Sequence, residues 1–212
     1  MPYLPIDPAD VGRSYEAVIR VNSQSGKGGV AFIMEKDHGL ELPRRLQIEF
    51  SKVIQEISDG TGKEIESDQI WQAFDNEFLQ SSTPLSFVEH HTEAENHDES
   101  HRTIEAKILI NGAAKTVNGS GNGPIDAFVD SLTKTFGLDF RVVDYHQHAT
   151  GSGSGAQSAC FVEIQVGKGE TRYGVGLHSN IVFASLIAVC SAVNRASKDI
   201  LAFNTAEATE AG

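Results

Sequence analysis

The chain has 212 residues and a formal net charge of −12, with 29 acidic against 17 basic side chains, which argues against nucleic acid as a partner. No apolar run approaches the roughly 20 residues of a membrane span and no signal sequence precedes the first elements, so we expect a cytoplasmic protein without membrane contact. Cys160 and Cys190 both lie in apolar patterns, which predicts two small buried hydrophobic residues and no disulfide.

Residues 1–80 predict an extended start followed by a small, mainly helical linker module. The segment 15–21 alternates as a strand, and the apolar segment 30–36 predicts a short helix. Pro43 opens a second helix, whose inner face would carry Leu46, Phe50, Val53, Ile54 and Ile57. Ser67 is the expected N-cap of a third helix, whose inner side would carry Trp71, Phe74 and Phe78.

Within residues 81–101 the run Glu89–His101 is acidic and almost free of large apolar side chains. This composition predicts a solvated, flexible linker. It contains four histidines among carboxylates, but nothing in the sequence fixes their geometry, so we expect no metal site there. These histidines are His90, His91, His97 and His101.

Residues 102–198 predict a second domain built from an internal duplication. An alternating strand runs to Asn111-Gly112, the strongest short hairpin signal, and its returning partner leads to a helix opened by Pro124. A second hairpin and helix follow about 56 residues later, with a further strand over 138–149 between the copies. We therefore predict an α+β fold: a helical module and a pseudo-twofold β-hairpin–helix domain with helices on one face of an antiparallel sheet. Residues 199–212 are expected to be a frayed tail.

The segment Gly119–Pro124 indicates a ligand-binding corner. Glycine permits a positive φ or the close approach of another group, and Pro124 fits the first position of a helix. Free backbone N–H groups and the helix dipole at such a corner favour a carboxylate or phosphate. The alternative is a tight turn that only packs.

The sequence carries no catalytic constellation. His146 and His148 share one face of a strand, but two imidazoles do not make a metal site, and no nucleophile elbow or paired carboxylates appear. From the residues alone we predict a binding domain with an attached helical module.

Several segments resemble, in order and with similar spacing over residues 3–197, the C-terminal half of the 2-isopropylmalate synthases, and most closely the actinobacterial type. The segments that carry the resemblance are Tyr15–Gly29, His38–Leu40, Leu42–Arg44, Gly119–Pro124, Asp144–Tyr145, His148–Ala149, Gly174–Gly176 and Ser191–Ala196.

The resemblance implies a regulatory role. In that family a (β/α)₈ barrel condenses acetyl-CoA with 2-oxoisovalerate using a divalent metal, and linker subdomains join it to a dimerising domain that binds leucine and inhibits the enzyme. A barrel needs about 250 residues, and none is present in this sequence. We therefore expect no catalytic residue, no metal or other cofactor and no acyltransfer by this chain alone. Its expected partners are leucine, a second copy and the barrel of the same enzyme.

By resemblance, the leucine pocket would lie between the two duplicated units. Its implied wall comprises Gly121, Gly123, Ile125, Val142, Tyr145, Ala149 and Ala156. Tyr15 matches a linker tyrosine implicated in coupling leucine binding to catalysis. The chain departs from the family pattern at Asp126 and at residues 153–155.

Two other functions are compatible with these residues. The first is a dimerisation scaffold whose pocket has decayed, in which case the departures would matter. The second is the related regulatory domain of the citramalate synthases, which responds to isoleucine. An independent enzyme is not expected.

Overall fold

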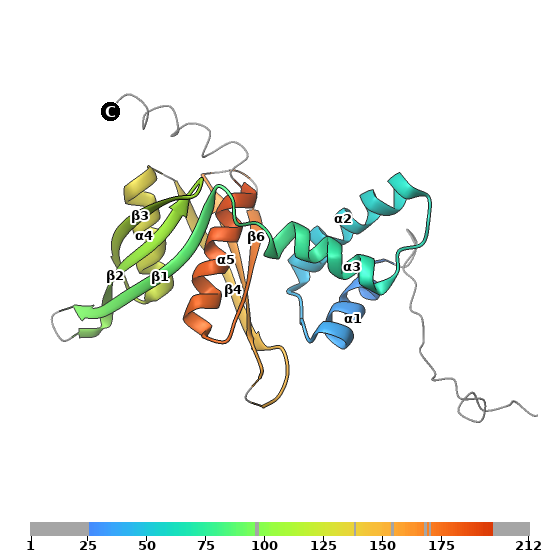
Figure 1. The fold of residues 1–212 in the computed structure, drawn as a ribbon, viewed down its shortest axis with the longest axis horizontal. Helices are drawn as coiled ribbons and strands as arrows, with labels where there is room; N and C mark the ends of the chain where they lie inside the picture. The colour runs from blue at the N-terminus through green and yellow to red at the C-terminus, as the bar shows by residue number, and fades with distance from the viewer. Residues whose placement is uncertain are drawn as a thin grey trace, which may run out of the picture.

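The computed structural model describes residues 26–95, 98–137, 139–153, 155–167, 169 and 171–196. These residues form an α+β fold with two three-stranded antiparallel sheets, as Figure 1 shows. The fold class predicted from the sequence is confirmed. Tyr15 and the predicted tail lie outside the described residues.

The first part is the helical module, residues 26–79. It consists of α1 (Gly26–His38), α2 (Arg44–Thr61), α3 (Ser67–Phe74) and a short π-helix (Asp75–Leu79). The three predicted helices are thus confirmed. Helix α2 buries Leu46, Phe50 and Ile54 as expected, whereas Ile57 is 40% exposed at the edge of the predicted face.

The cap of α3 differs from the prediction. Glu66, not Ser67, is the N-cap: its side chain accepts a hydrogen bond from the backbone N–H of Gln69, and its own N–H donates to Gln69 Oε1 at 3.1 Å. This reciprocal arrangement is a capping box. Ser67 is the first helical residue, and its hydroxyl donates to Asp37 at 2.7 Å, which ties α3 to the end of α1.

Residues 85–196 form the sandwich domain, two copies of a unit of three strands and a helix. The first unit comprises β1 (Leu85–Glu95), β2 (Asp98–Ile110), β3 (Ala113–Gly121) and α4 (Pro124–Phe136). The second comprises β4 (Phe140–Ala149), β5 (Ser158–Val166), β6 (Thr171–His178) and α5 (Ile181–Ala196). The predicted duplication and the predicted strand before the second hairpin are confirmed, and a corresponding strand, β1, precedes the first hairpin.

The acidic segment expected to be a flexible linker is a strand from Leu85 to Glu95. This strand, β1, pairs antiparallel with β2, with Leu85 opposite Ile110. A bulge after Phe87 shifts the alternation, so His90 and Thr92 continue the half-buried face that Leu85 and Phe87 begin. The bulge interrupts the two-residue alternation, and the half-buried positions after it are polar. Because no apolar alternation therefore marks this strand, the prediction of a flexible linker was wrong.

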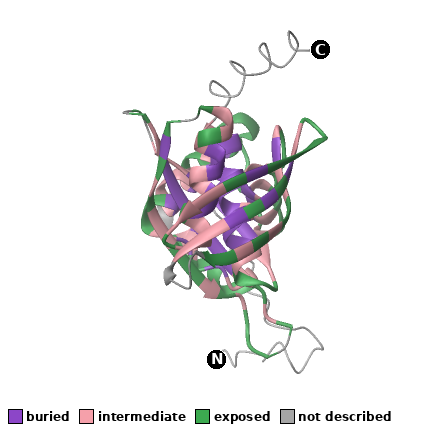
Figure 2. Cartoon of the chain, turned by 90° about the vertical axis from the view of Figure 1, so that its left-hand side faces the viewer, coloured by how far each residue is buried: buried purple, intermediate pink, exposed green. Residues whose placement is uncertain are grey.

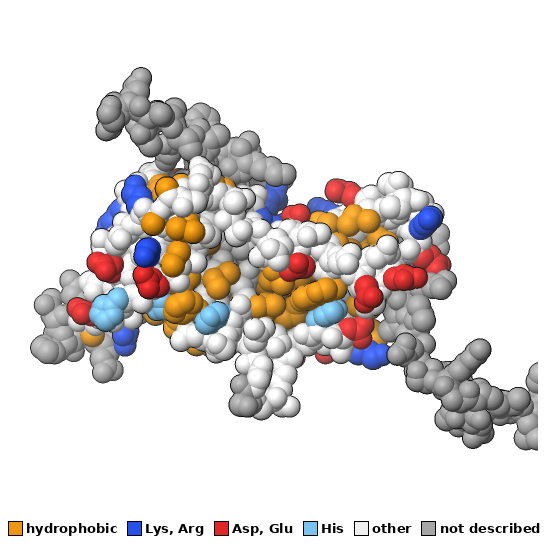
Figure 3. Space-filling model, in the orientation of Figure 1, with side chains coloured by type: hydrophobic (Ala, Val, Ile, Leu, Met, Phe, Trp, Pro, Cys, Tyr) orange, Lys and Arg blue, Asp and Glu red, His pale blue; other side chains and the backbone are white. Residues whose placement is uncertain are grey.

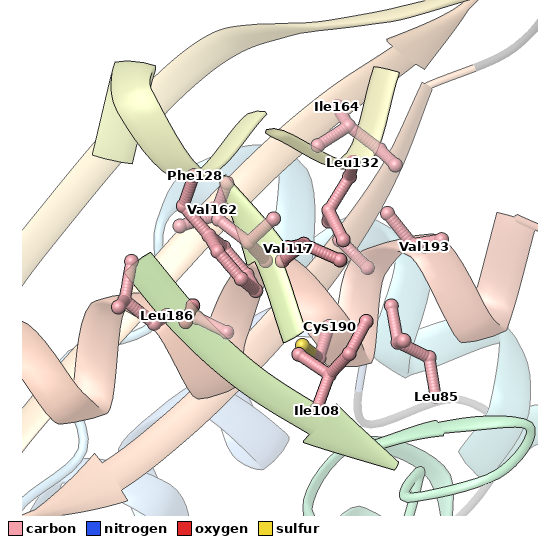
Figure 4. Close-up of a cluster of buried hydrophobic side chains, with 14 of the residues drawn as sticks. Leu85, Ile108, Val117, Phe128, Leu132, Val162, Ile164, Leu186, Cys190 and Val193 are labelled. Carbon is pink, nitrogen blue, oxygen red and sulfur yellow. The ribbon is translucent and has the colours of Figure 1, made fainter. Parts of the chain in front are cut away.

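The two helices of the sandwich domain lie between its two sheets, where the sequence predicted one sheet with helices on a single face. One continuous core joins both helices and both sheets (Figure 4). Along β2, exposed residues such as Glu105 and Lys107 alternate with buried Ile104, Ala106 and Ile108, which face the core. Figure 2 shows buried and exposed stretches alternating along strands of the sandwich domain. This alternation is typical of an antiparallel sheet with one solvated side.

Strand β5 is buried on both sides. Cys160, Val162 and Ile164 face the core of the sandwich domain. Ala159 and Phe161, on the other side, pack into a second core with the helical module, together with Tyr173 and Val175 of β6. The helical module therefore covers the outer face of the second sheet. Both cysteines are buried and free, as predicted, and burial raises the pKa of the Cys190 thiol.

The end of α5 holds the helical module in place through two polar side chains. Ser191 Oγ donates to the carbonyl oxygen of Phe78 at 2.7 Å. Asn194 Nδ2 donates to the carbonyl oxygens of Ser81 (2.7 Å) and Leu85 (2.6 Å), and Asn194 Oδ1 accepts the Leu85 N–H at 2.9 Å. These bonds fix the chain where it passes from the π-helix into β1.

We expect Asn194→Asp to lower the free energy of unfolding by about 2 kcal/mol. The carboxylate still accepts the Leu85 N–H, but it brings a buried charge against two carbonyl oxygens that have lost their donor. Urea denaturation followed by circular dichroism measures the change. Asn118→Asp, at an exposed position of β3, is the matched control and is expected to change stability by no more than about 0.5 kcal/mol. Equal stability of the two variants would contradict the proposed importance of these bonds.

The exposed large hydrophobic side chains of the described residues come from five different elements: Phe32, Ile57, Val88, Val143 and Ile181. Figure 3 shows hydrophobic, charged and histidine side chains interspersed over one face of the molecule. Among the helices described, none has both the length and the apolar character needed to cross a membrane.

Candidate ligand-binding site

The corner between β3 and α4 has the form that the sequence predicts. Strand β3 ends at Gly121, Gly123 is the N-cap, and α4 begins at Pro124. The backbone at Gly123 is extended, with φ −174°, and neither Gly119 nor Gly121 has a positive φ. The sequence suggested two reasons for these glycines, a positive φ and the close approach of another group. The first of them is wrong here.

Close packing explains two of the glycines in this corner. A Cβ atom added at Gly119 would lie 2.2 Å from the carbonyl oxygen of Ala127, and one added at Gly121 would lie 2.7 Å from the Ala127 nitrogen. Such distances are shorter than any real contact, so both glycines allow α4 to lie directly on β3. Gly123 has open space beside it, because nothing lies within 4 Å of an added Cβ.

The two equivalent corners of the duplication differ in how their helices begin. At the start of α5, Asn180 Oδ1 accepts the backbone N–H groups of Val182 (2.9 Å) and Phe183 (3.1 Å). At the start of α4 no side chain of the described residues caps the helix, and the first intrahelical bond runs from Ala127 to Gly123. The N–H groups of Ile125 and Asp126 at this corner have no such cap. Free N–H groups in the first turn of a helix are the kind of donor that binds an anion.

Strand β4 supplies the apolar residues of the predicted site. Val142 and Tyr145 are half-buried and pack against the same core as Ile125. A bulge between Val142 and Asp144 gives Val142 and Tyr145 the same side of the strand despite their spacing of three residues. The structure thus places Val142 and Tyr145 on one side of β4, and Ile125 of α4 packs against the same core.

The hydroxyl of Tyr145 lies in a polar contact that the sequence did not reveal. It is 3.0 Å from Ser185 Oγ of α5 and also contacts Gln147 Oε1. Burial raises the pKa of Tyr145, so its phenol stays protonated and can donate. Only 3% of Ser185 is exposed, and its contact with Tyr145 links α5 to β4. No local pattern marks Ser185, because its partner is 40 residues away.

Ala149 ends β4 and Ala156 lies in the loop after it, and neither belongs to the core against which Ile125, Val142 and Tyr145 pack. Ala149 is the last residue of the strand and stands opposite Ser158. Ala156 is in the following loop, where its N–H donates to the Gly153 carbonyl oxygen at 3.2 Å. Figure 1 shows this loop projecting from the body of the molecule.

His146 and His148 do lie on one side of β4, as their spacing predicts, and each has a partner in the protein. His146 Nε2 is 2.9 Å from Asp144 Oδ2. His148 Nε2 is 3.1 Å from both the Glu41 nitrogen and the Gly39 carbonyl oxygen. Within the described ranges no group of three or more His, Cys, Asp or Glu side chains is arranged to hold a metal ion.

Two cavities formed by described residues lie elsewhere, where α2 meets the second sheet and the end of α5. Their volumes are about 360 and 650 Å³. Both are bordered by Glu49, Lys52 and Arg172, and neither includes a residue of the predicted site.

Comparison with known proteins places most of the chain in one family. Residues 64–197 match the LeuA allosteric (dimerisation) domain, and residues 1–35 match the domain described as alpha-isopropylmalate synthase, post-catalytic domain-like. The chain is 54% identical to the 2-isopropylmalate synthase of Mycobacterium leprae over 196 residues and 49% identical to that of Rhodospirillum rubrum over 197 residues. The synthase of Brucella suis is 50% identical over 196 residues.

These matches cover nearly the whole chain but only part of each relative. They include 92%, 93% and 92% of this chain, and 32%, 35% and 35% of the synthases of M. leprae, R. rubrum and B. suis. The chain thus spans about a third of the length of the curated relatives it matches.

Proposed function

The chain belongs to the family of LeuA allosteric (dimerisation) domains, and from this premise we propose that it is the leucine-binding, feedback-regulating part of a 2-isopropylmalate synthase. The catalytic activity, condensation of acetyl-CoA with 2-oxoisovalerate, would belong to a barrel that works together with this chain. We further propose that two copies associate through the sandwich domain. The two free, buried cysteines fit a reducing compartment such as the cytoplasm.

The uncapped start of α4 is the observation that carries the proposal. Leucine presents a carboxylate, which the N–H groups of Ile125 and Asp126 and the positive end of the helix dipole would bind. The pseudo-equivalent start of α5 is closed by its own Asn180, whereas α4 has no side-chain cap among the described residues. Asp126 is exposed in the first turn and supplies the negative charge that an ammonium group requires.

The apolar part of the ligand is matched by the neighbouring side chains. Ile125, Val142 and Tyr145 are half-buried at the edge of one core, so a branched aliphatic group placed against them would lose contact with water. Sites for small ligands commonly combine such an apolar wall with a few fixed polar groups.

Isothermal titration calorimetry with leucine tests the proposal. We expect saturable heat with the unmodified chain, and Val142→Phe is expected to weaken binding by about tenfold or more, because the larger ring takes the position proposed for the branched side chain of the ligand. Val143→Phe is the matched control: Val143 sits in the bulge and is 36% exposed, so the same enlargement there is expected to leave leucine binding unchanged. Absence of heat at millimolar leucine with the unmodified chain would contradict the proposal.

A dimerisation scaffold without a ligand is the second candidate. The observation that favours it is the contact of the Tyr145 hydroxyl with Ser185 and Gln147, because the protein's own groups then satisfy the polar atom at the site. Sedimentation with and without leucine separates the two: the scaffold would dimerise equally in both. A domain of the isoleucine-responsive type would instead give heat with isoleucine that leucine does not compete away.

A further inference from the structure

Strand β4 presents its two sides to two different parts of the molecule. Val142 and Tyr145 face the core between the sheets, where the proposed leucine site lies. Asp144 and His148 face the other way. His148 stacks on Phe161 with ring centroids 5.5 Å apart, and Asp144 contacts Tyr173. Phe161 and Tyr173 both belong to the core shared with the helical module.

The first contact between β4 and the helical module is backbone against backbone. Gly39, directly after α1, has a φ of +66°, and a Cβ added there would lie 2.1 Å from the carbonyl oxygen of Thr150. His148 Nε2 lies 3.1 Å from the Gly39 carbonyl oxygen and from the Glu41 nitrogen. The end of β4 therefore cannot move without moving the chain between α1 and α2, or breaking contact with it.

The second contact runs from the β4 bulge through buried Tyr173 and Glu163 to Arg45, whose side chain is 69% exposed. The Tyr173 hydroxyl donates to Asp144 Oδ2 at 3.3 Å. Burial and the nearby carboxylates of Glu163 and Asp144 raise the pKa of Tyr173, so the phenol stays a donor. Only 1% of Glu163 is exposed, and its carboxylate accepts from Arg45 Nη1 of α2 at 3.2 Å. The chain of contacts thus extends from the bulge to α2.

The position of β4 in its sheet gives it only one neighbouring strand among the described residues. The sheet order is β4-β5-β6, so β4 is an edge strand. Strand β5 is held between two cores, and β6 is held against α5 by Gly174, whose added Cβ would lie 2.1 Å from the Ala188 carbonyl oxygen. A ligand that presses on the inner side of the sheet therefore has one strand that can respond most easily.

We propose that β4 is the link between the ligand site and the helical module. Leucine bound against Val142 and Tyr145 shifts β4. The other side of the strand passes that shift to the end of α1 through Gly39, and to α2 through the series of contacts Asp144–Tyr173–Glu163–Arg45. This inference rests on the proposed function. A ligand can shift a conformational equilibrium only if it interacts differently with the two states, and some element of the protein must differ between those states. In this inference that element is β4.

The single tryptophan of the chain is a reporter at the right place. Trp71 of α3 stacks on His38, with centroids 4.1 Å apart and an interplanar angle of 14°. His38 is the residue immediately before Gly39, so a change at the first contact reaches the Trp71 ring directly. Burial lowers the pKa of His38, and its imidazole is neutral at pH 7.5.

The test follows calorimetric heat and Trp71 fluorescence in parallel during a leucine titration at pH 7.5. With the unmodified chain we expect both signals to saturate together. With Gly39→Ala we expect heat to persist while the Trp71 response falls by about fivefold or more, because the added methyl group forces Thr150 away. Gly62→Ala is the matched control: Gly62 has a φ of +65° but open space around it, so it shares the backbone strain without the collision.

His148→Ala provides a second variant should Gly39→Ala unfold, as circular dichroism would show. It removes the imidazole contact and leaves the backbone unaltered, and the same loss of the Trp71 response is expected. Tyr173→Phe removes the hydroxyl that donates to Asp144 in the second contact, and a loss of the Trp71 response is expected there as well. Heat without a Trp71 response in the unmodified chain, or an unchanged response in His148→Ala and Tyr173→Phe, would overturn the inference while the proposed function stands. No heat in the unmodified chain would overturn the proposed function and the inference with it.

Discussion

Gly174→Ala is expected to lower the free energy of unfolding by about 3 kcal/mol or more, the upper range for overpacking a buried site. A Cβ at this position would lie 2.1 Å from both the Ala188 carbonyl oxygen and the Ala192 nitrogen. These are backbone atoms of α5, so no side-chain rotation relieves the collision and the helix itself must move. Because α5 packs against both sheets, its displacement disturbs the whole core of the sandwich domain.

Urea denaturation of Gly174→Ala and Gly60→Ala, followed by circular dichroism, measures this effect against a matched substitution. Gly60 is an exposed position inside α2 with no atom within 4 Å of an added Cβ. Alanine there is expected to stabilise the protein by about 0.5–1 kcal/mol, because it lowers the conformational entropy of the unfolded chain. A Gly174→Ala variant as stable as the unmodified chain would show that α5 does not lie as close to β6 as described.

Arg195→Ala is expected to cost about 3 kcal/mol and to loosen the helical module. The Arg195 side chain is 9% exposed and lies 2.7 Å from carboxylate oxygens of both Glu49 and Glu77. It also covers the Phe78 ring at 4.0 Å from the centroid and donates to the Tyr173 carbonyl oxygen. Removing it leaves two carboxylates close together without their shared cation, although the 41% exposure of Glu77 moderates the cost.

Thermal unfolding, together with the fluorescence of Trp71 in the folded state, measures this prediction. Arg141→Ala is the control, since exposed Arg141 bonds only to the side chain of Gln165 in the part of the chain described, and a change within about 0.5 kcal/mol is expected. Arg195→Lys is expected to recover only part of the loss, because an ammonium group cannot reproduce the planar fork of the guanidinium. Full stability of Arg195→Lys would mean that charge alone, not geometry, holds the module.

The sequence predicted those features that depend on residues near one another along the chain. Pro124 opens α4 as expected, and Asn111 and Gly112 both have positive φ, 50° and 86°, in the tight turn between β2 and β3. Such turns follow from local backbone preferences. The duplicated units were visible because the same local signals recur in the same order.

Long-range features could not be predicted in this way. Strand β1 depends on pairing with β2 and is hidden by its bulge, and the two-sheet arrangement depends on helices packed between strands from both units. The bonds of Asn194 with Leu85 and of Arg195 with Glu77 join residues 109 and 118 positions apart. The motif Ser191–Ala196 was recognised from family resemblance, but only the structure explains it, as the attachment of the helical module.

The candidate site was predictable in part. The helix start at the corner follows the prediction. Ile125, Val142 and Tyr145 all pack against the core of the sandwich domain, and their role in binding leucine stays a proposal. The function given to Gly121 was incomplete, because its need for glycine comes from Ala127 of the helix that lies over it. Ser185 was missed, since its contact with Tyr145 joins separate elements.

The burial of β5 on both sides bears on how this molecule can be divided. A shorter protein that began after the π-helix would bring Phe161, Tyr173 and Val175 into water, all of them fully or almost fully covered in the intact chain. Apolar side chains newly exposed on a sheet invite aggregation. The helical module thus shields the second sheet from water, and any exchange of the sandwich domain between proteins would have to include the helical module as well.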